Sequence, residues 1–250
     1  MKSRLSIVLG VSIAVLSGCS IKFTQPQNAW QVKAVSAFQN YQQYYLEGRV
    51  ILADSERKKA ISQAKQSANL ETLARVYIAD CAIQAAVLRS SDCALYLQVR
   101  PLVKAPELEA YYHLLSGDLT LSEVDKLPTQ YQSFAKAWLS GKTGELDKLI
   151  LSMASVESQL VAASLVKEKL ALNTLRDLIQ KTANYGYKLA SIRWMEYLSK
   201  RTPDALESQH LLQKIEILSL RYCRESPKGI NLGLESPLRK TFVLSQGTSF

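Results

Sequence analysis

Apolar residues recur every three or four positions along most of the chain, which is the spacing of an amphipathic helix. The first such segment runs from Ala29 to Glu47 and stops before Gly48, a residue that can end a helix in the left-handed conformation. Runs that alternate Val, Ile or Thr with polar residues, as strands do, are missing as far as Tyr222. The pattern therefore predicts an all-α body.

Further breaks in the periodicity coincide mostly with Pro, Gly or clusters of polar residues, where helices are expected to begin and end. Short helices joined by short turns favour antiparallel α-hairpins. The expected ranges after the first helix are about 54–68, 70–88, 93–102, 106–116, 121–126, 129–140, 145–153, 156–171, 173–183, 187–200 and 203–223.

A weak internal repeat supports a stack of such hairpins. Leu115-Ser116-Gly117 precedes an acidic helix start, and Leu139-Ser140-Gly141 does the same 24 positions later. Together with Tyr44-Tyr45-Leu46-Glu47-Gly48 and Tyr112-His113-Leu114-Leu115-Ser116-Gly117, these segments resemble units of tetratricopeptide or Sel1-like repeats. The resemblance implies a short tetratricopeptide-like α-solenoid. A non-repetitive helical bundle is the alternative.

The first residues of the chain have the features of a secretory signal peptide. Lys2 and Arg4 precede an apolar stretch from Leu5 to Leu16, which is shorter than the ~20 residues of a membrane-spanning helix. The junction Leu16-Ser17-Gly18-Cys19 resembles the lipobox of bacterial lipoproteins. That resemblance implies cleavage after residue 18 and a covalent diacylglyceryl group on Cys19. Since Ser20 and not Asp follows the cysteine, it also implies the outer membrane, with the protein facing the periplasm.

The expected organisation is thus a signal peptide at 1–18, the lipidated Cys19 with a short linker at 19–28, a helical repeat domain at 29–223, and a C-terminal tail at 224–250. Several Pro and Gly residues interrupt this tail, which we expect to be extended or flexible and non-helical.

Composition narrows the class of protein. The 250 residues are 47% hydrophobic and include 4 Cys, which excludes a disordered or a disulfide-dense chain. The net charge is +9, and removal of Lys2 and Arg4 leaves +7. Because the basic residues are spread along the chain, we expect no nucleic-acid partner. Peptidoglycan carboxylates, anionic lipid headgroups and acidic proteins fit this charge better in the periplasm.

Three cysteines besides Cys19 would lie in an oxidising compartment. Cys81 and Cys93 are twelve residues apart across an expected helix end. A disulfide between them requires that the helix stop early and the chain fold straight back, because their Cα atoms must come within about 7 Å. Pairing with Cys223, or free buried thiols, are the alternatives.

The sequence offers no convincing catalytic or metal site. Its 2 histidines, His113 and His210, are far apart and lack the spacing of zinc ligands. Glu157-Ser158-Gln159 and Glu207-Ser208-Gln209 resemble the Glu-Ser context of lytic transglycosylases, but the Gly-Leu-Met-Gln segment of that family is absent. We therefore expect no catalytic residue, no metal and no cofactor apart from the lipid, and we interpret both triplets as solvated helix faces.

The leading hypothesis is a non-enzymatic scaffold that is held at the membrane by its lipid and binds an envelope protein, with peptidoglycan as a further candidate partner. Its binding face would be concave and rich in tyrosine. The candidate residues are Tyr44, Tyr45, Tyr111 and Tyr112. The alternatives are a peptidoglycan-acting enzyme with a buried glutamate and a periplasmic module that binds a small ligand in an enclosed pocket.

Overall fold

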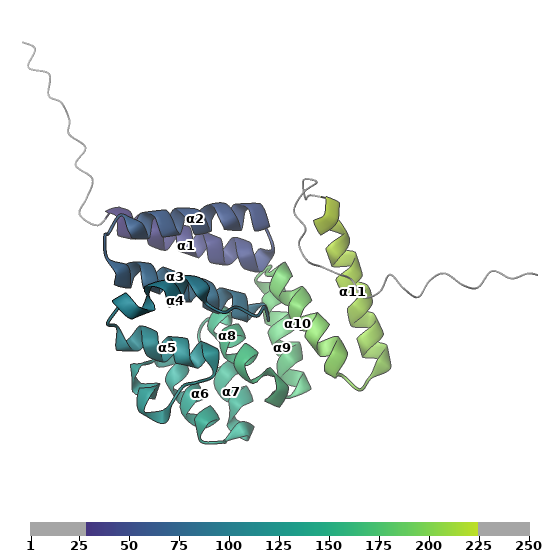
Figure 1. The fold of residues 1–250 in the computed structure, drawn as a ribbon. Helices are drawn as coiled ribbons and strands as arrows, with labels where there is room; N and C mark the ends of the chain where they lie inside the picture. The colour runs from purple at the N-terminus through teal and green to yellow at the C-terminus, as the bar shows by residue number, and fades with distance from the viewer. Residues whose placement is uncertain (1–28, 225–250) are drawn as a thin grey trace, which may run out of the picture.

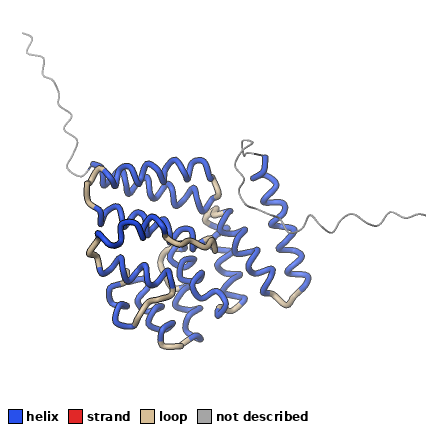
Figure 2. The backbone as a smooth tube through the Cα atoms, viewed as in Figure 1, coloured by secondary structure: helices blue, strands red, loops and turns tan. Residues whose placement is uncertain are grey.

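The computed structural model describes residues 29–224, and the side chains of residues 29–219. These residues form helices joined by short turns, with no strand in this part of the chain, so the predicted all-α class is confirmed (Figures 1 and 2). The α-helices are α1 (Ala29–Glu47), α2 (Val50–Lys65), α3 (Leu70–Ala86), α4 (Ala94–Val99), α5 (Pro106–Ser116), α6 (Thr129–Leu139), α7 (Leu146–Leu151), α8 (Val156–Val166), α9 (Leu172–Asn184), α10 (Lys188–Arg201) and α11 (Ala205–Arg224). Four 3₁₀ turns lie between them, η1 (Arg100–Leu102), η2 (Leu121–Lys126), η3 (Thr143–Glu145) and η4 (Lys167–Lys169).

Helices α1 and α2 form the hairpin at the top of Figure 1. The turn needs only two residues, because Gly48 has a φ of 81° and Arg49 donates its backbone N–H to the carbonyl oxygen of Tyr44 at 2.8 Å. Helix α2 consequently begins at Val50, earlier than the predicted start near residue 54. Alanines at the buried positions of both helices let the two backbones approach closely; they are Ala34, Ala37, Ala53, Ala60 and Ala64.

Helix α3 ends earlier than predicted, and this changes the position of the cysteines. The helix stops at Ala86, and Leu88 takes a left-handed φ of 57° that turns the chain back. Cys93, with a φ of 53°, then precedes α4. The Cα atoms of Cys81 and Cys93 come to 5.4 Å, and the structure joins the two residues by a disulfide.

The two copies of the sequence repeat end their helices in the same way. Gly117 after α5 has a φ of 87°, and Gly141 after α6 has a φ of 71°. Such values favour glycine because it lacks a Cβ. The copies then diverge: Glu123 and Glu145 both lie in 3₁₀ turns, but η3 continues directly into the α-helix α7, whereas η2 is followed by the extended residue Leu127.

Other boundaries also differ from the predictions, among them the ends of α8 and α11. Helix α8 gives way to the 3₁₀ turn η4 at Lys167 and does not continue to residue 171. Helix α11 includes Arg224, the first residue assigned to the tail. The signal peptide, Cys19, the linker and the rest of the tail lie outside the described residues. No helix of the described part is long and apolar enough to cross a membrane.

The buried apolar side chains form three clusters. The largest extends from Leu46 to Leu211 and includes Trp194, which is fully buried. A second cluster draws only on residues 64–108, around the disulfide and Tyr96. The third is small and holds α1 and α2 against α3. The helices thus stack in layers on a core that most of them share.

Candidate functional site

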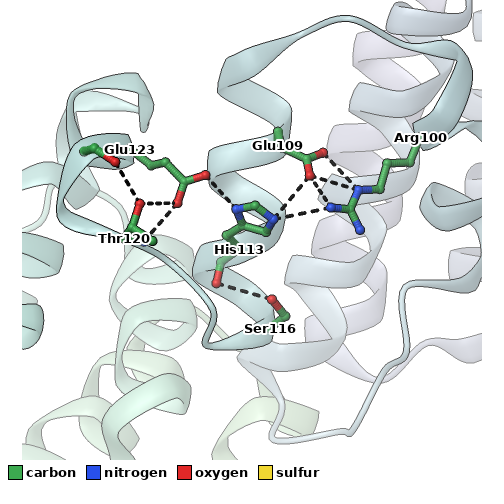
Figure 3. Close-up of polar contacts among 7 residues, drawn as sticks. Arg100, Glu109, His113, Ser116, Thr120 and Glu123 are labelled. Carbon is green, nitrogen blue, oxygen red and sulfur yellow. Dashed lines mark hydrogen bonds and ion pairs between the residues drawn. The ribbon is translucent and has the colours of Figure 1, made fainter.

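The densest polar cluster of the described residues surrounds His113 on α5 (Figure 3). Its ring nitrogen Nδ1 lies 2.7 Å from Oε1 of Glu123, and Nε2 lies 3.2 Å from Oε1 of Glu109, one helical turn earlier. The His113 side chain is 23% exposed and that of Glu123 is 17% exposed. A carboxylate therefore faces each nitrogen of a half-buried imidazole.

Arg100 completes one side of this cluster. Its Nε lies 3.0 Å from both carboxylate oxygens of Glu109, and its Nη2 also contacts that carboxylate. The same Nη2 is 3.3 Å from Nε2 of His113, and the guanidinium carbon lies 4.7 Å from the ring centre of Tyr112. Because Arg100 lies in η1 and Glu109 in α5, this contact joins the two elements.

Glu123 completes the other side through a capping box at the start of η2. Its Oε2 accepts hydrogen bonds from the hydroxyl of Thr120 at 2.7 Å and from the Thr120 backbone N–H at 2.9 Å. These bonds, and then the contact with His113, lower the pKa of Glu123 to about 2. Glu123 is therefore a carboxylate at neutral pH, so Nδ1 of His113 is the donor in the contact between them.

An imidazole between two carboxylates can relay a proton, but nucleophilic catalysis also needs a hydroxyl or thiol within its reach. The nearby hydroxyls are engaged elsewhere. Ser116 donates to the backbone carbonyl oxygen of His113 at 3.4 Å, and Thr120 donates to Glu123. The His113 cluster thus fastens η1, α5 and η2 together. In the sequence, two signals point to it: the Glu109–His113 spacing and the Thr120–Glu123 capping box.

A second polar cluster is more deeply buried and joins α1, α2 and α3. The hydroxyl of Tyr41 donates to Oδ1 of Asp80 at 2.5 Å, and Arg57 donates from Nε to Oδ1 at 3.0 Å and from Nη2 to Oδ2 at 2.7 Å. Burial, and then the charge of Asp80, raises the pKa of Tyr41. This cluster satisfies a carboxylate that is only 4% exposed, as buried charged groups require.

The four tyrosines predicted to form a binding face lie on α1 and α5, and they are half-buried. Tyr44 and Tyr45 pack against the small cluster between α1, α2 and α3, whereas Tyr111 and Tyr112 pack against the second cluster. Each ring fills space between neighbouring helices, because adjacent positions on a helix point to different neighbours. Within the described residues they do not form one exposed face.

The first Glu-Ser-Gln triplet is not the solvated helix face that we expected, whereas the second lies on a partly exposed face of α11. Ser158 and Gln159 are buried, and the amide of Gln159 donates to the carbonyl oxygen of Met153 at 2.7 Å. Glu207 accepts two bonds from Arg176, at 2.7 and 2.8 Å, and another from Thr202, which lower its pKa to about 2. A glycosidase acid needs a raised pKa, so Glu207 is unsuited to that role.

Across the described residues, no group of three or more His, Cys, Asp or Glu side chains could hold a metal ion. The fold and its polar clusters define an all-α protein of stacked hairpins. No family model, no curated protein and no solved structure matches the chain.

Proposed function

We propose that the protein is a lipoprotein of the bacterial outer membrane that faces the periplasm and acts as a non-enzymatic scaffold for an envelope protein. The observation that carries this proposal is Leu16-Ser17-Gly18-Cys19, which follows a basic start and a short apolar run. The covalent lipid on Cys19 would supply the membrane attachment, because two or more acyl chains bind stably where one binds only marginally.

The disulfide between Cys81 and Cys93 supports export from the cytoplasm. Structural disulfides persist in oxidising compartments such as the periplasm and are rare in the cytosol. Since the bond is independent of the N-terminal motif, it is a second line of support for the same compartment.

The surface of the helical stack supports a scaffold better than an enzyme. The hydroxyls of Ser116 and Thr120, beside His113, are already used as donors within the cluster. Glu207 is paired with Arg176, which lowers its pKa. Large apolar side chains, in contrast, lie exposed on α2 and α11, for example Ile51 and Leu206. Exposed apolar surface on a helical stack is suited to binding another protein.

Acylation is tested by expressing the full chain in a bacterium with an outer membrane and feeding it an alkyne-tagged fatty acid. The parent protein is expected to carry the label and to sediment with outer membranes. Cys19→Ser should lose both properties, and the matched control Cys223→Ser should keep them. Label that persists in Cys19→Ser, or a parent protein found in the soluble fraction, would contradict the proposal.

The scaffold role is tested by crosslinking in native membranes, followed by identification of the captured proteins. We expect one envelope protein to be enriched reproducibly, and its capture to be lost when surface residues at the crosslinked position are changed. Clearing of a peptidoglycan gel by the purified protein would favour the glycan enzyme instead.

A further inference from the structure

The N-terminal ends of α1 and α3 and the C-terminal end of α2 meet at one edge of the molecule, on the left of Figure 1. The hydrogen bond from Asn40 on α1 to Glu56 on α2 fixes the antiparallel register, so the first turns of α1 lie beside the last turn of α2. A four-residue connection then leads to Leu70 at the start of α3. We name residues 29–36 and 65–72 the N-terminal edge.

Apolar side chains are unusually exposed on this edge. Val32 is 72% exposed and Val35, on the same side of α1, is 52% exposed, while Leu70 at the start of α3 is 41% exposed. Trp30, half-buried in the first turn of α1, lies next to them in sequence. Aromatic and aliphatic groups of this kind suit the boundary between water and lipid.

The unpaired charges of the edge are positive. Lys33 and Lys65 are exposed, and neither forms an ion pair with any described residue. The only acid of the edge, Glu71, is held by Arg75 at 2.7 Å. Further along α2, Lys58 is paired with Asp54. The edge therefore presents two free ammonium groups beside exposed apolar side chains.

The chain between Cys19 and α1 is short enough to keep this edge near a membrane that holds the lipid. Nine residues, 20–28, separate Cys19 from the first residue of α1. Ten fully extended steps span at most roughly 36 Å, so an acylated Cys19 keeps the start of α1 within that distance of the lipid surface. Such tethering raises the effective concentration of the N-terminal edge at the lipid surface, so that contacts too weak to hold a free protein can form.

We infer that the N-terminal edge docks on an anionic lipid surface, with Lys33 and Lys65 at the headgroups and Val32, Val35 and Leu70 against the interface. The inference rests on the proposed acylation of Cys19. The lysines attract anionic headgroups only within about one Debye length, ~8 Å at physiological salt. Docking therefore adds a second point of contact with the membrane besides the lipid on Cys19 and thereby fixes the orientation of the helical stack.

The test uses the full acylated chain in two sets of vesicles, one of phosphatidylcholine alone and one with 30% phosphatidylglycerol. Amide hydrogen exchange is followed by mass spectrometry. On the anionic vesicles we expect exchange within residues 29–36 and 65–72 to slow by about threefold or more, and 0.5 M salt to reverse the effect.

Three variants define the contribution of each group. Lys33→Glu with Lys65→Glu should abolish the protection, and Val32→Ser with Val35→Ser should weaken it. The matched control is Lys126→Glu with Lys136→Glu, which changes two exposed lysines of η2 and α6 and should leave protection intact. An unchanged thermal midpoint in each variant shows that the fold is retained.

The experiment distinguishes a failure of the proposed acylation from a failure of the docking. A chain that carries no lipid refutes the proposed function. An acylated chain that binds the vesicles but shows no protected edge refutes the docking alone. Equal protection on both vesicle types would overturn docking on anionic lipid. Protection that grows with protein density at constant lipid would also overturn it and would indicate contacts between copies of the chain.

Discussion

The indole Nε1 of Trp194 donates a hydrogen bond to the backbone carbonyl oxygen of Ala86 at 2.9 Å, and both residues are completely buried. Ala86 is the last residue of α3, where carbonyl groups have no partner within the helix. A side chain from α10 thus caps a helix 108 positions earlier in the chain.

We predict that Trp194→Phe lowers the free energy of unfolding by about 2–4 kcal/mol, because it leaves the Ala86 carbonyl unsatisfied and opens a void. Trp138→Phe, at a half-buried position, should cost less than about 1.5 kcal/mol. Urea unfolding curves measure both values, and similar losses in the two variants would contradict the importance of the bond.

Asp80 should be the most sensitive residue of the buried cluster between α1, α2 and α3. Asp80→Asn is expected to cost about 2–3 kcal/mol, since it leaves Arg57 without its carboxylate, although the guanidinium is exposed enough to regain some water. Tyr41→Phe should cost about 1–2 kcal/mol. A double-mutant cycle tests the contact, and strictly additive losses would mean that Tyr41 and Asp80 are not coupled.

Removal of the disulfide should cost about 3 kcal/mol, the expected entropic contribution of a loop of this length. The measurement compares Cys81→Ala with Cys93→Ala in one chain against the control Cys223→Ala, which removes a cysteine but leaves the disulfide in place. Three free thiols in the intact mass of the unreduced protein would show that the bond is absent in solution.

Stability should fall in acid partly through Glu123. Its pKa is about 2 in the folded chain and about 4.3 when unfolded, so it stabilises the fold above about pH 4.3, and this contribution is lost as the pH falls towards 2. Thr120→Ala removes the largest cause of the low pKa and should raise it. Carboxyl NMR titration reads the pKa directly, and a midpoint near 4 in the parent protein would be inconsistent with the capping box.

Local signals predicted much of the fold. The bounds of α1 and α5 were predicted as observed, because Gly48 and Gly117 end these helices and Pro106 starts the second. The end of α3 was missed because Leu88, not glycine, takes the left-handed conformation there. The sequence gives no local reason for that turn, which the packing of α10 and the disulfide stabilise from a distance.

The candidate site was less predictable than the helices. The contact between Tyr41 and Asp80 joins residues 39 positions apart, and no periodicity indicates it. Tyr111 and Tyr112 on α5 were candidates for a binding face, but the ring of Tyr111 packs at a tilt against Tyr131 and that of Tyr112 against Tyr96. Ring partners of this kind depend on how the hairpins stack, which a single sequence does not specify.

The second apolar cluster has a consequence for the order in which the chain folds. All its buried members lie between Ala64 and Leu108, and the disulfide closes a loop within that stretch. Contacts so close in sequence close only short loops and therefore form quickly. Because synthesis supplies residues in order from the N-terminus, this part of the chain can begin to collapse before α6 to α11 are present. The bond from Trp194 on α10 to the Ala86 carbonyl oxygen then completes the end of α3 when the later hairpins pack on it.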